Sequence, residues 1–235
     1  MSVDAVMTEL RALGSPNIAR IFQRHGAPSS TLGVKVGDLK PIVKRLKGQH
    51  ALALELYATG VSDAMYLAGL VADGRQMTPD QLDAWAEAAT WSMISEYTVP
   101  WVTSDHPAAL DRARAWIRSP QPHVATAGWA TFSTVVSIRP DAQLDHAELA
   151  ALLDEVAATL HGAPNRVRYT MNGFVIAVGS FVAGLTDHAR RVGEALGEVH
   201  VDQGGTACEV PSVVDTLDKI AAKGKVGAKR KVARC

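Results

Sequence analysis

The chain has 235 residues, 47% of them hydrophobic and 20% charged, which is the composition of a folded globular protein and excludes disorder of the whole chain. Its 24 Lys and Arg balance its 24 Asp and Glu, so the formal net charge is zero. Two cysteines, Cys208 and Cys235, are too few for a disulfide framework, and the first residues do not combine a basic flank with a long apolar run. We therefore expect a cytoplasmic protein with free thiols.

Nearly every segment of the chain has the apolar periodicity of a helix. The clearest helix start is Thr78-Pro79-Asp80-Gln81, with a capping Thr78, proline in the first turn and Gln81 reaching back. Helices are expected in pairs about forty residues apart: 61–73 with 78–88, 105–118 with 120–137, and 145–161 with 165–178. Such pairs predict an all-α, HEAT-like solenoid whose concave side is the usual binding surface, with a compact irregular helical bundle as the alternative.

The C-terminal part of the chain differs from the rest. Residues 198–202, EVHVD, alternate apolar and polar side chains and predict a short strand. Residues 219–235 contain no acid and seven basic side chains, Lys219, Lys223, Lys225, Lys229, Arg230, Lys231 and Arg234. Residues 1–218 therefore keep 17 basic against 24 acidic side chains, a formal charge of −7. We expect a solenoid domain over 1–218 and a basic, mobile tail over 219–235, which either binds a polyanion or serves only solubility.

Several stretches resemble a known family in order and spacing. They are GVKVGDLKPIVKRL (33–46), SDAMYLAGLVADG (62–74), AATWSMISEYTVPWVTSDHP (88–107), WIRSPQPHVATAGW (116–129) and NRVRYTMNGFVIAVG (165–179). Together they resemble the bacterial DNA alkylation repair enzymes, which are HEAT-like alkylpurine DNA glycosylases. The resemblance covers roughly residues 30–180. Beyond it, VHVDQGGTACEVP (199–211) and the basic tail look like one subgroup of that family.

The resemblance implies a solenoid whose concave face grips duplex DNA by its backbone. In the glycosylase members an aspartate stabilises the sugar cation that develops as the damaged base leaves, and tryptophans line the same cleft. The motif around that aspartate resembles W-W-D-x-V-D, and the matching stretch here is Trp91-Ser92-Met93-Ile94-Ser95-Glu96. Trp91 matches the first tryptophan and Glu96 the catalytic aspartate, whereas the second tryptophan and the first aspartate are missing.

Glu96 is therefore the candidate catalytic carboxylate, since a negative charge close to the anomeric carbon is what the chemistry demands. Its extra methylene would displace that charge, and the alternative is a solvated carboxylate near a helix end. Trp129, like Trp91, occupies a family position and either lines the cleft or fills the core between repeats. The family pattern also places a phosphate-holding arginine on the next repeat, where residues 123–129 offer His123 and Thr126 but no arginine.

The helix predicted over 165–178 carries three further candidates. Arg166 and Arg168 are two positions apart and point in different directions, so at most one is expected to face the groove. The alternative for this pair is salt bridges with the acid-rich helix 145–155. Asn172 lies in an apolar run, where a buried amide must find partners, so it either ties adjacent helices together or reaches the binding face.

Three hypotheses of function follow. The first is a DNA glycosylase that excises alkylated, cationic purines, with Glu96, Trp91 and Trp129 at the reacting nucleotide. Its DNA contacts would come from Lys35, Lys40, Lys44, His123, Arg166, Arg168, Asn172, Lys223, Lys225, Lys229, Arg230 and Lys231. The second is a non-catalytic protein of the same fold that binds bent or branched DNA. The third is a protein-binding solenoid, which the acidic body permits.

The sequence predicts neither a metal site nor a cofactor. The histidines and Cys208 lack paired metal-ligand spacing, and no phosphate-binding loop or dinucleotide fingerprint occurs. The most apolar stretch, residues 173–185, is too short and too rich in glycine to span a bilayer. We therefore expect a nucleoid-associated monomer with double-stranded DNA as its partner and no membrane.

Overall fold

The computed structural model describes residues 1–206 and 208–234, and over these residues it contains helices and no strand. The prediction of an all-α, HEAT-like fold is confirmed. The α-helices are α1 (Val3–Leu13), α2 (Pro16–Arg24), α3 (Val36–Leu46), α4 (His50–Ala58), α5 (Ser62–Val71), α6 (Pro79–Ala88), α7 (Val99–Ser104), α8 (Ala109–Trp116), α9 (Pro122–Ile138), α10 (His146–Thr159), α11 (Asn165–Phe181), α12 (Thr186–Leu196) and α13 (Val213–Ala222).

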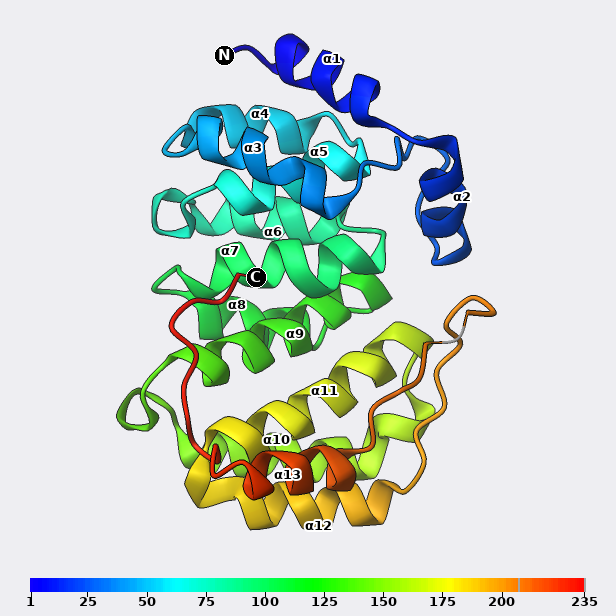
Figure 1. Cartoon of the computed structure of the whole chain (residues 1–235). Coiled ribbons are helices and arrows are strands. Elements are labelled where there is room, and N and C mark those ends of the chain that lie inside the picture. The colour runs from blue at the N-terminus through cyan, green and yellow to red at the C-terminus, as the bar shows by residue number, and fades with distance from the viewer. Residues whose placement is uncertain (207, 235) are drawn as a thin grey trace.

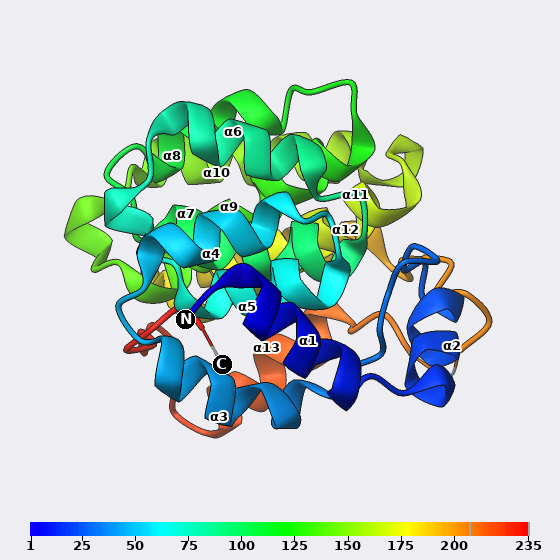
Figure 2. The same ribbon diagram turned by 90° about the horizontal axis from the view of Figure 1, so that it is seen from above.

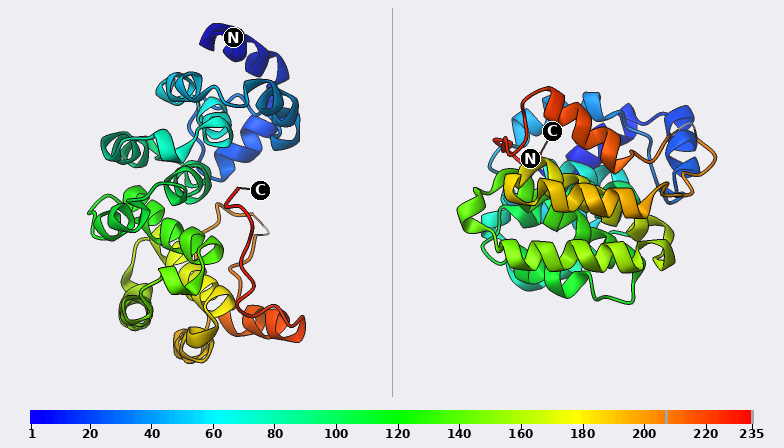
Figure 3. Two further views of the ribbon diagram at one scale, coloured as in Figure 1. Left: turned by 90° about the vertical axis from the view of Figure 1, so that its left-hand side faces the viewer. Right: turned by 90° about the horizontal axis from the view of Figure 1, so that it is seen from below.

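The helices stack in two layers along a curved axis (Figure 1; Figure 3, left). The outer layer contains α4, α6, α8, α10 and α12, and the inner layer contains α5, α7, α9 and α11 (Figure 3, left). The predicted start of α6 is confirmed. The Thr78 hydroxyl accepts a hydrogen bond from the Gln81 N–H, and the Gln81 side-chain oxygen accepts one from the Thr78 N–H. Each unit thus buries the apolar faces of one outer and one inner helix against its neighbours.

One predicted pairing differs from the structure. The sequence pairs helix 61–73 with helix 78–88, but α5 lies in the inner layer and α6 in the outer layer of the next unit. The inner helix that accompanies α6 is formed by residues 94–104, where the η2 helix (Ile94–Thr98) continues into α7. Pro100 and the polar residues around Trp91 hide this helix from a search for apolar periodicity.

The predicted strand over 198–202 is wrong. No strand forms there, because side chains of α11 take up the backbone groups that a partner strand would need. The Asn165 amide donates to the Asp202 carbonyl at 2.9 Å and accepts from the Asp202 N–H at 2.8 Å. Arg168 donates to the His200 carbonyl at 2.7 Å. The segment between α12 and α13 is therefore extended and held by single side chains.

The C-terminal residues also differ from the prediction. The proposed boundary at residue 219 falls inside α13, and the described residues after it return along the concave side of the stack (Figure 1; Figure 3, left). Two main-chain bonds fix their path, from Gly227 to the Ser180 carbonyl and from Arg230 to the Ser137 carbonyl, each 2.8 Å. Cys235 lies outside the described residues.

Side chains of this C-terminal strap, which we define as residues 223–234, make ion pairs with the body. Lys229 lies 2.7 Å from the Asp141 carboxylate and donates to the Val136 carbonyl. Arg234 pairs with Asp105 at 3.2 Å and donates to the Ala72 carbonyl at 2.8 Å, while Ala233 is buried. The strap is thus docked on the solenoid, in place of the separate, mobile tail that its composition predicts.

Within the described part of the chain, no single helix is long and apolar enough to cross a membrane. The one pair of consecutive helices that is apolar enough, Asn165–Phe181 with Ala183–Leu196, is bent by 117°.

Candidate nucleic-acid interface

Glu96 lies on the inner side of the solenoid in an unusual helical turn. Residues Ile94–Thr98 form a π-helix, in which the Val99 N–H bonds to the Ile94 carbonyl five residues back. Pro100 follows, and because it has no N–H it cannot bond to the Glu96 carbonyl as the next turn of an α-helix requires. Wide turns of this kind often mark functional sites. Here the turn directs Glu96 inward, toward α11.

Arg166 of α11 holds the Glu96 carboxylate from across the inner layer. Its Nε donates to one carboxylate oxygen at 2.7 Å and its Nη2 to the other at 2.6 Å, which makes the pair bidentate. The Glu96 side chain is only 4% exposed and that of Arg166 is 29% exposed. The remaining Nη1 donates to the Gln203 amide oxygen at 2.9 Å, and the guanidinium carbon lies 4.4 Å from the centre of the Tyr169 ring.

Burial governs the protonation of this carboxyl. Loss of solvent raises the pKa of Glu96 from its ordinary value of 4.5 to about 7, and the positive charge of Arg166 opposes the rise. Between these two values the folded protein binds the proton more tightly than the unfolded chain does. The carboxyl therefore contributes stability that is full below about pH 4.5 and is lost as the pH rises through about 7.

Substitution of Glu96 tests that sign. The free energy of unfolding of wild type relative to Glu96→Gln should fall as the pH rises from 4.5 to about 7 and then level off. Urea denaturation followed by circular dichroism at four or five pH values would measure it. Glu198→Gln is the matched control, because the Glu198 side chain is 82% exposed. A difference that grows with pH would mean that Arg166 outweighs burial.

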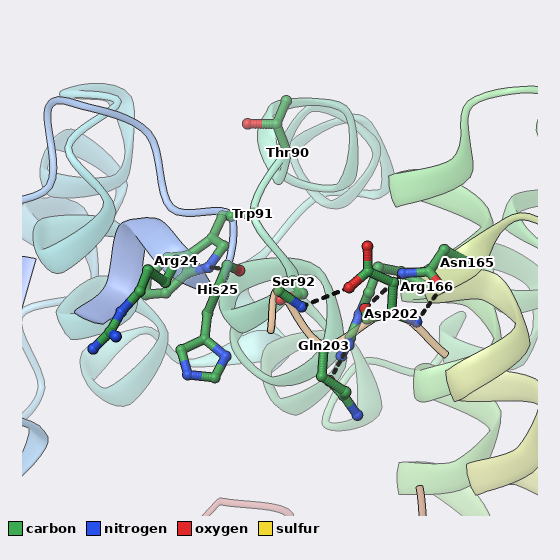
Figure 4. A pocket seen from close by; sticks show the side chains of 11 residues that line it. Arg24, His25, Thr90, Trp91, Ser92, Asn165, Arg166, Asp202 and Gln203 are labelled. Atoms are coloured by element: carbon green, nitrogen blue, oxygen red, sulfur yellow. Dashed lines mark hydrogen bonds between the residues drawn. The ribbon is translucent and has the colours of Figure 1, made fainter. Parts of the chain in front are cut away.

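The pair lies between two cavities on the concave side. A cavity of about 320 Å³ has Arg24, His25 and Trp91 on one side and Asn165, Arg166 and Asp202 on the other, with Gln203 between them (Figure 4). The second cavity, about 520 Å³, reaches Glu96 itself. It is lined by Phe22, His25, Trp91, Ser92, Met93, Glu96, Tyr97, Arg166, Tyr169, Gln203, Cys208 and Glu209.

One edge of these cavities is formed where the N-terminal helix α2 meets the segment that follows α12. The segment after α12 passes beside α2, as both Figure 1 and Figure 2 show. Gly204 makes the closest approach, with a φ of +71°, and a Cβ there would lie 1.9 Å from the Arg24 carbonyl oxygen. Only glycine fits this position, so the sequence Gln203-Gly204 sets the distance between the N-terminal and C-terminal walls.

The two candidate tryptophans occupy different environments. Trp91 borders both cavities, with its indole N–H donating to the His25 carbonyl at 3.1 Å and its ring 5.5 Å from Phe22. Trp129 is 2% exposed and packs in the core against Phe132 and Phe174. That position does not suit a wall of the cleft, so the core interpretation describes Trp129 and the cleft interpretation describes Trp91.

The remaining candidates on the inner helices bond to main-chain carbonyl groups of the protein. The ring of His123 contacts the Glu87 carbonyl at 2.9 Å, at the end of α6 rather than beside Glu96. Arg168 holds the His200 and Ala163 carbonyls, and the buried Asn172 amide donates to the Pro211 carbonyl at 2.9 Å. Asn172 thus ties α11 to the segment before α13.

The expected alternative for the arginine pair, salt bridges with helix 145–155, is wrong. Acids of α10 pair with other partners: Glu148 with Arg114, Glu155 with Arg118, and Asp154 with His188. These partners lie on the outer helices α8 and α12 or, for Arg118, just after α8, which leaves Arg166 for Glu96. The arginine beside the carboxylate therefore comes from α11. Because Arg166 and Glu96 are 70 residues apart in the sequence, no local sequence pattern predicts their contact.

Basic side chains collect on the concave side in spite of the acidic body. Lys40 and Lys44 on α3 and Lys35 just before it are exposed, and α3 lies on the same side as α13 and the strap (Figures 2 and 3). Within the described residues, no ion pair engages these three lysines or Lys223, Lys225, Arg230 and Lys231 of the strap. Lys229 and Arg234 neutralise Asp141 and Asp105. A surface of this charge suits a phosphate backbone.

The described residues show no group of three or more His, Cys, Asp or Glu side chains placed to hold a metal ion.

Comparison with known proteins agrees with this architecture. The family model described as DNA alkylation repair enzyme matches residues 6–187. The uncharacterized protein Lin0241 of Listeria innocua is 35% identical over 225 residues, 93% of this chain and 97% of that protein. The uncharacterized protein Lmo0209 of Listeria monocytogenes is 34% identical over 231 residues, 96% and 100% of the two chains.

A solved structure covers the whole of both chains with a TM-score of 0.91 and 33% sequence identity. It is described as a new family of proteins related to the HEAT-like repeat DNA glycosylases with affinity for branched DNA structures. Fold and sequence point the same way, and the chain belongs to the DNA alkylation repair enzyme family.

Proposed function

We propose that this protein binds branched DNA in its concave groove and does not excise a base. The observation that carries the proposal is the bidentate pair between Glu96 and Arg166. By the resemblance of residues 91–96 to the family motif, Glu96 matches the catalytic aspartate of the glycosylases. In this protein a guanidinium already neutralises the carboxylate at that position, within a nearly buried contact.

Excision needs a negative charge next to the sugar. The transition state of glycosidic cleavage resembles an oxocarbenium ion, and a carboxylate stabilises it only where the charge is available in a partly dry site. Both Glu96 oxygens accept hydrogen bonds from Arg166, and burial raises the pKa of Glu96 to about 7. The carboxyl is thus compensated when it is ionised and neutral in part of the molecules near neutral pH.

Binding to DNA rests on other observations. The concave side carries seven exposed or half-exposed basic side chains from α3 and the strap with no ion pair within the described residues: Lys35, Lys40, Lys44, Lys223, Lys225, Arg230 and Lys231. Such an array supplies salt-dependent, sequence-independent contacts to phosphates. A relative that matches this chain over its whole length is described as having affinity for branched DNA, which supports the choice of a branch as the DNA form in this proposal.

A base-release assay tests the absence of excision. Wild-type protein is incubated with duplex DNA containing methylated, cationic purines, and the released bases are separated by liquid chromatography. We expect no release above that of the DNA alone, for wild type and Glu96→Gln alike, while a glycosylase control releases the base. Release by wild type that Glu96→Gln abolishes would assign Glu96 a catalytic role and replace this proposal with excision.

A further inference from the structure

A third cavity, about 240 Å³, lies farther along the concave side, between α7, α9, α11 and the strap. It shares Glu96, Tyr97 and Tyr169 with the 520 Å³ cavity, so the two open side by side. Its lining is Glu96, Tyr97, Trp101, Ala130, Ser133, Thr134, Ser137, Tyr169, Thr170, Gly173, Ala177, Phe181 and Arg230. Of this lining, only Glu96 is among the catalytic candidates that the sequence motif identifies.

An exposed aromatic ring forms its entrance. Tyr97 follows Glu96 in the π-helix, is 39% exposed, and lines both cavities. Its ring is tilted at 55° to that of Trp101, with 5.8 Å between their centres. Across from it, α9 and α11 present Ala130, Gly173 and Ala177. Small residues on these two helices leave room for a planar group against the tyrosine.

Polar groups surround that aromatic surface. The hydroxyls of Ser133 and Thr134 donate to carbonyls of their own helix, at 2.9 and 2.8 Å, so their oxygens can accept hydrogen bonds from a ligand. Arg230 is fixed through its main chain to the Ser137 carbonyl, and its side chain is exposed, with no ion pair among the described residues. The only acid in the lining is Glu96, which Arg166 neutralises.

We infer that this cavity binds one unpaired nucleotide of a branched DNA, with its base stacked on Tyr97 and its phosphate beside Arg230. The inference rests on the proposed function and explains the preference for branches. In regular duplex both faces of each base are covered by neighbouring bases, whereas a base at a branch point can leave the stack. Aromatic stacking tolerates any base, since every base has a π-face.

Substitution at position 97 separates stacking from other effects. Affinities of wild type, Tyr97→Ala and Tyr97→Phe are measured for a three-way junction with unpaired nucleotides at its centre and for a linear duplex of the same length. Tyr97→Ala should weaken junction binding by about 5- to 100-fold and leave duplex binding within about twofold, since stacking is lost only with the unpaired base. Tyr97→Phe keeps the ring and should retain the junction affinity.

A fluorescent base reports the contact directly. With 2-aminopurine at the unpaired position, binding of wild type and Tyr97→Phe should quench the fluorescence, and binding of Tyr97→Ala at saturating concentration should not. Thermal unfolding of each variant shows whether the fold is kept.

The outcomes separate the inference from the proposed function. If wild type prefers the junction and Tyr97→Ala keeps both the preference and the quenching, the nucleotide site is wrong while branched-DNA binding stands. If wild type binds neither DNA, both are wrong. If wild type binds both DNAs equally and Tyr97→Ala changes neither affinity, the inference also fails.

Discussion

Replacement of Arg166 by methionine should lower the free energy of unfolding by about 3 kcal/mol, because it leaves Glu96 buried without its counterion. The estimate is at the lower end of what is typical for a broken buried pair, since the Arg166 side chain is 29% exposed. The change also removes the bond to Gln203, which helps to hold the segment after α12, and the contact with the Tyr169 ring on α11. Guanidinium denaturation followed by circular dichroism measures the loss.

Two further variants define the cause. The double substitution Glu96→Leu with Arg166→Met removes both charges and should recover most of the loss, since an apolar pair of similar size carries no desolvation penalty. Arg114→Met is the matched control, because Arg114 pairs with Glu148 on the outer helices and is 44% exposed. That pair should be worth about 1 kcal/mol or less. If Arg166→Met costs no more than Arg114→Met, the buried pair does not stabilise the inner layer.

Neutralising the strap should change how DNA binding depends on salt. The variant replaces Lys223, Lys225, Arg230 and Lys231 with glutamine and leaves Lys229 and Arg234 in their ion pairs with the body. If all four side chains meet phosphates, the slope of log affinity against log salt becomes shallower by about 3 to 4 units. The ratio of junction to duplex affinity should fall only modestly, because Lys223, Lys225 and Lys231 contact phosphates of either DNA and only Arg230 lies beside the unpaired nucleotide.

The control for this prediction removes charge from the opposite face. Arg114→Gln with Arg118→Gln acts on the outer layer, on α8 and just after it, where both side chains pair with acids of α10. Its salt slope should match that of wild type. An unchanged slope in the strap variant would show that the strap does not touch DNA and that its docking on α9 and α11 is purely structural.

Local patterns in the sequence were sufficient for most of the fold. Helices α6 and α8 to α11 lie within a few residues of their predicted ranges, because capping at Thr78 and apolar periodicity are local properties. The HEAT-like stack followed from the interval between pairs. The helix η2–α7 was not predicted, since a π-turn and Pro100 break the period of 3.6 residues on which such predictions depend.

The candidate site was predicted only in part. The motif around Trp91 belongs to a part of the inner layer where Trp91 and Glu96 both border a cavity. Its defining contact, between Glu96 and Arg166, joins residues 70 positions apart, and sequence spacing says nothing about such pairs. The basic composition of residues 219–235 predicts a mobile tail, because composition alone does not include the acidic partners that folding brings near Lys229 and Arg234, which are Asp141 and Asp105.

The central claim, branched-DNA binding in the concave groove, is tested most directly by one titration. Labelled three-way junction and linear duplex of equal length are titrated with wild-type protein at several salt concentrations, and fluorescence anisotropy gives the affinities. We predict tighter binding to the junction at every salt concentration and an affinity for both that falls as salt rises. Equal affinity for the two DNAs, or binding indifferent to salt, would contradict the account.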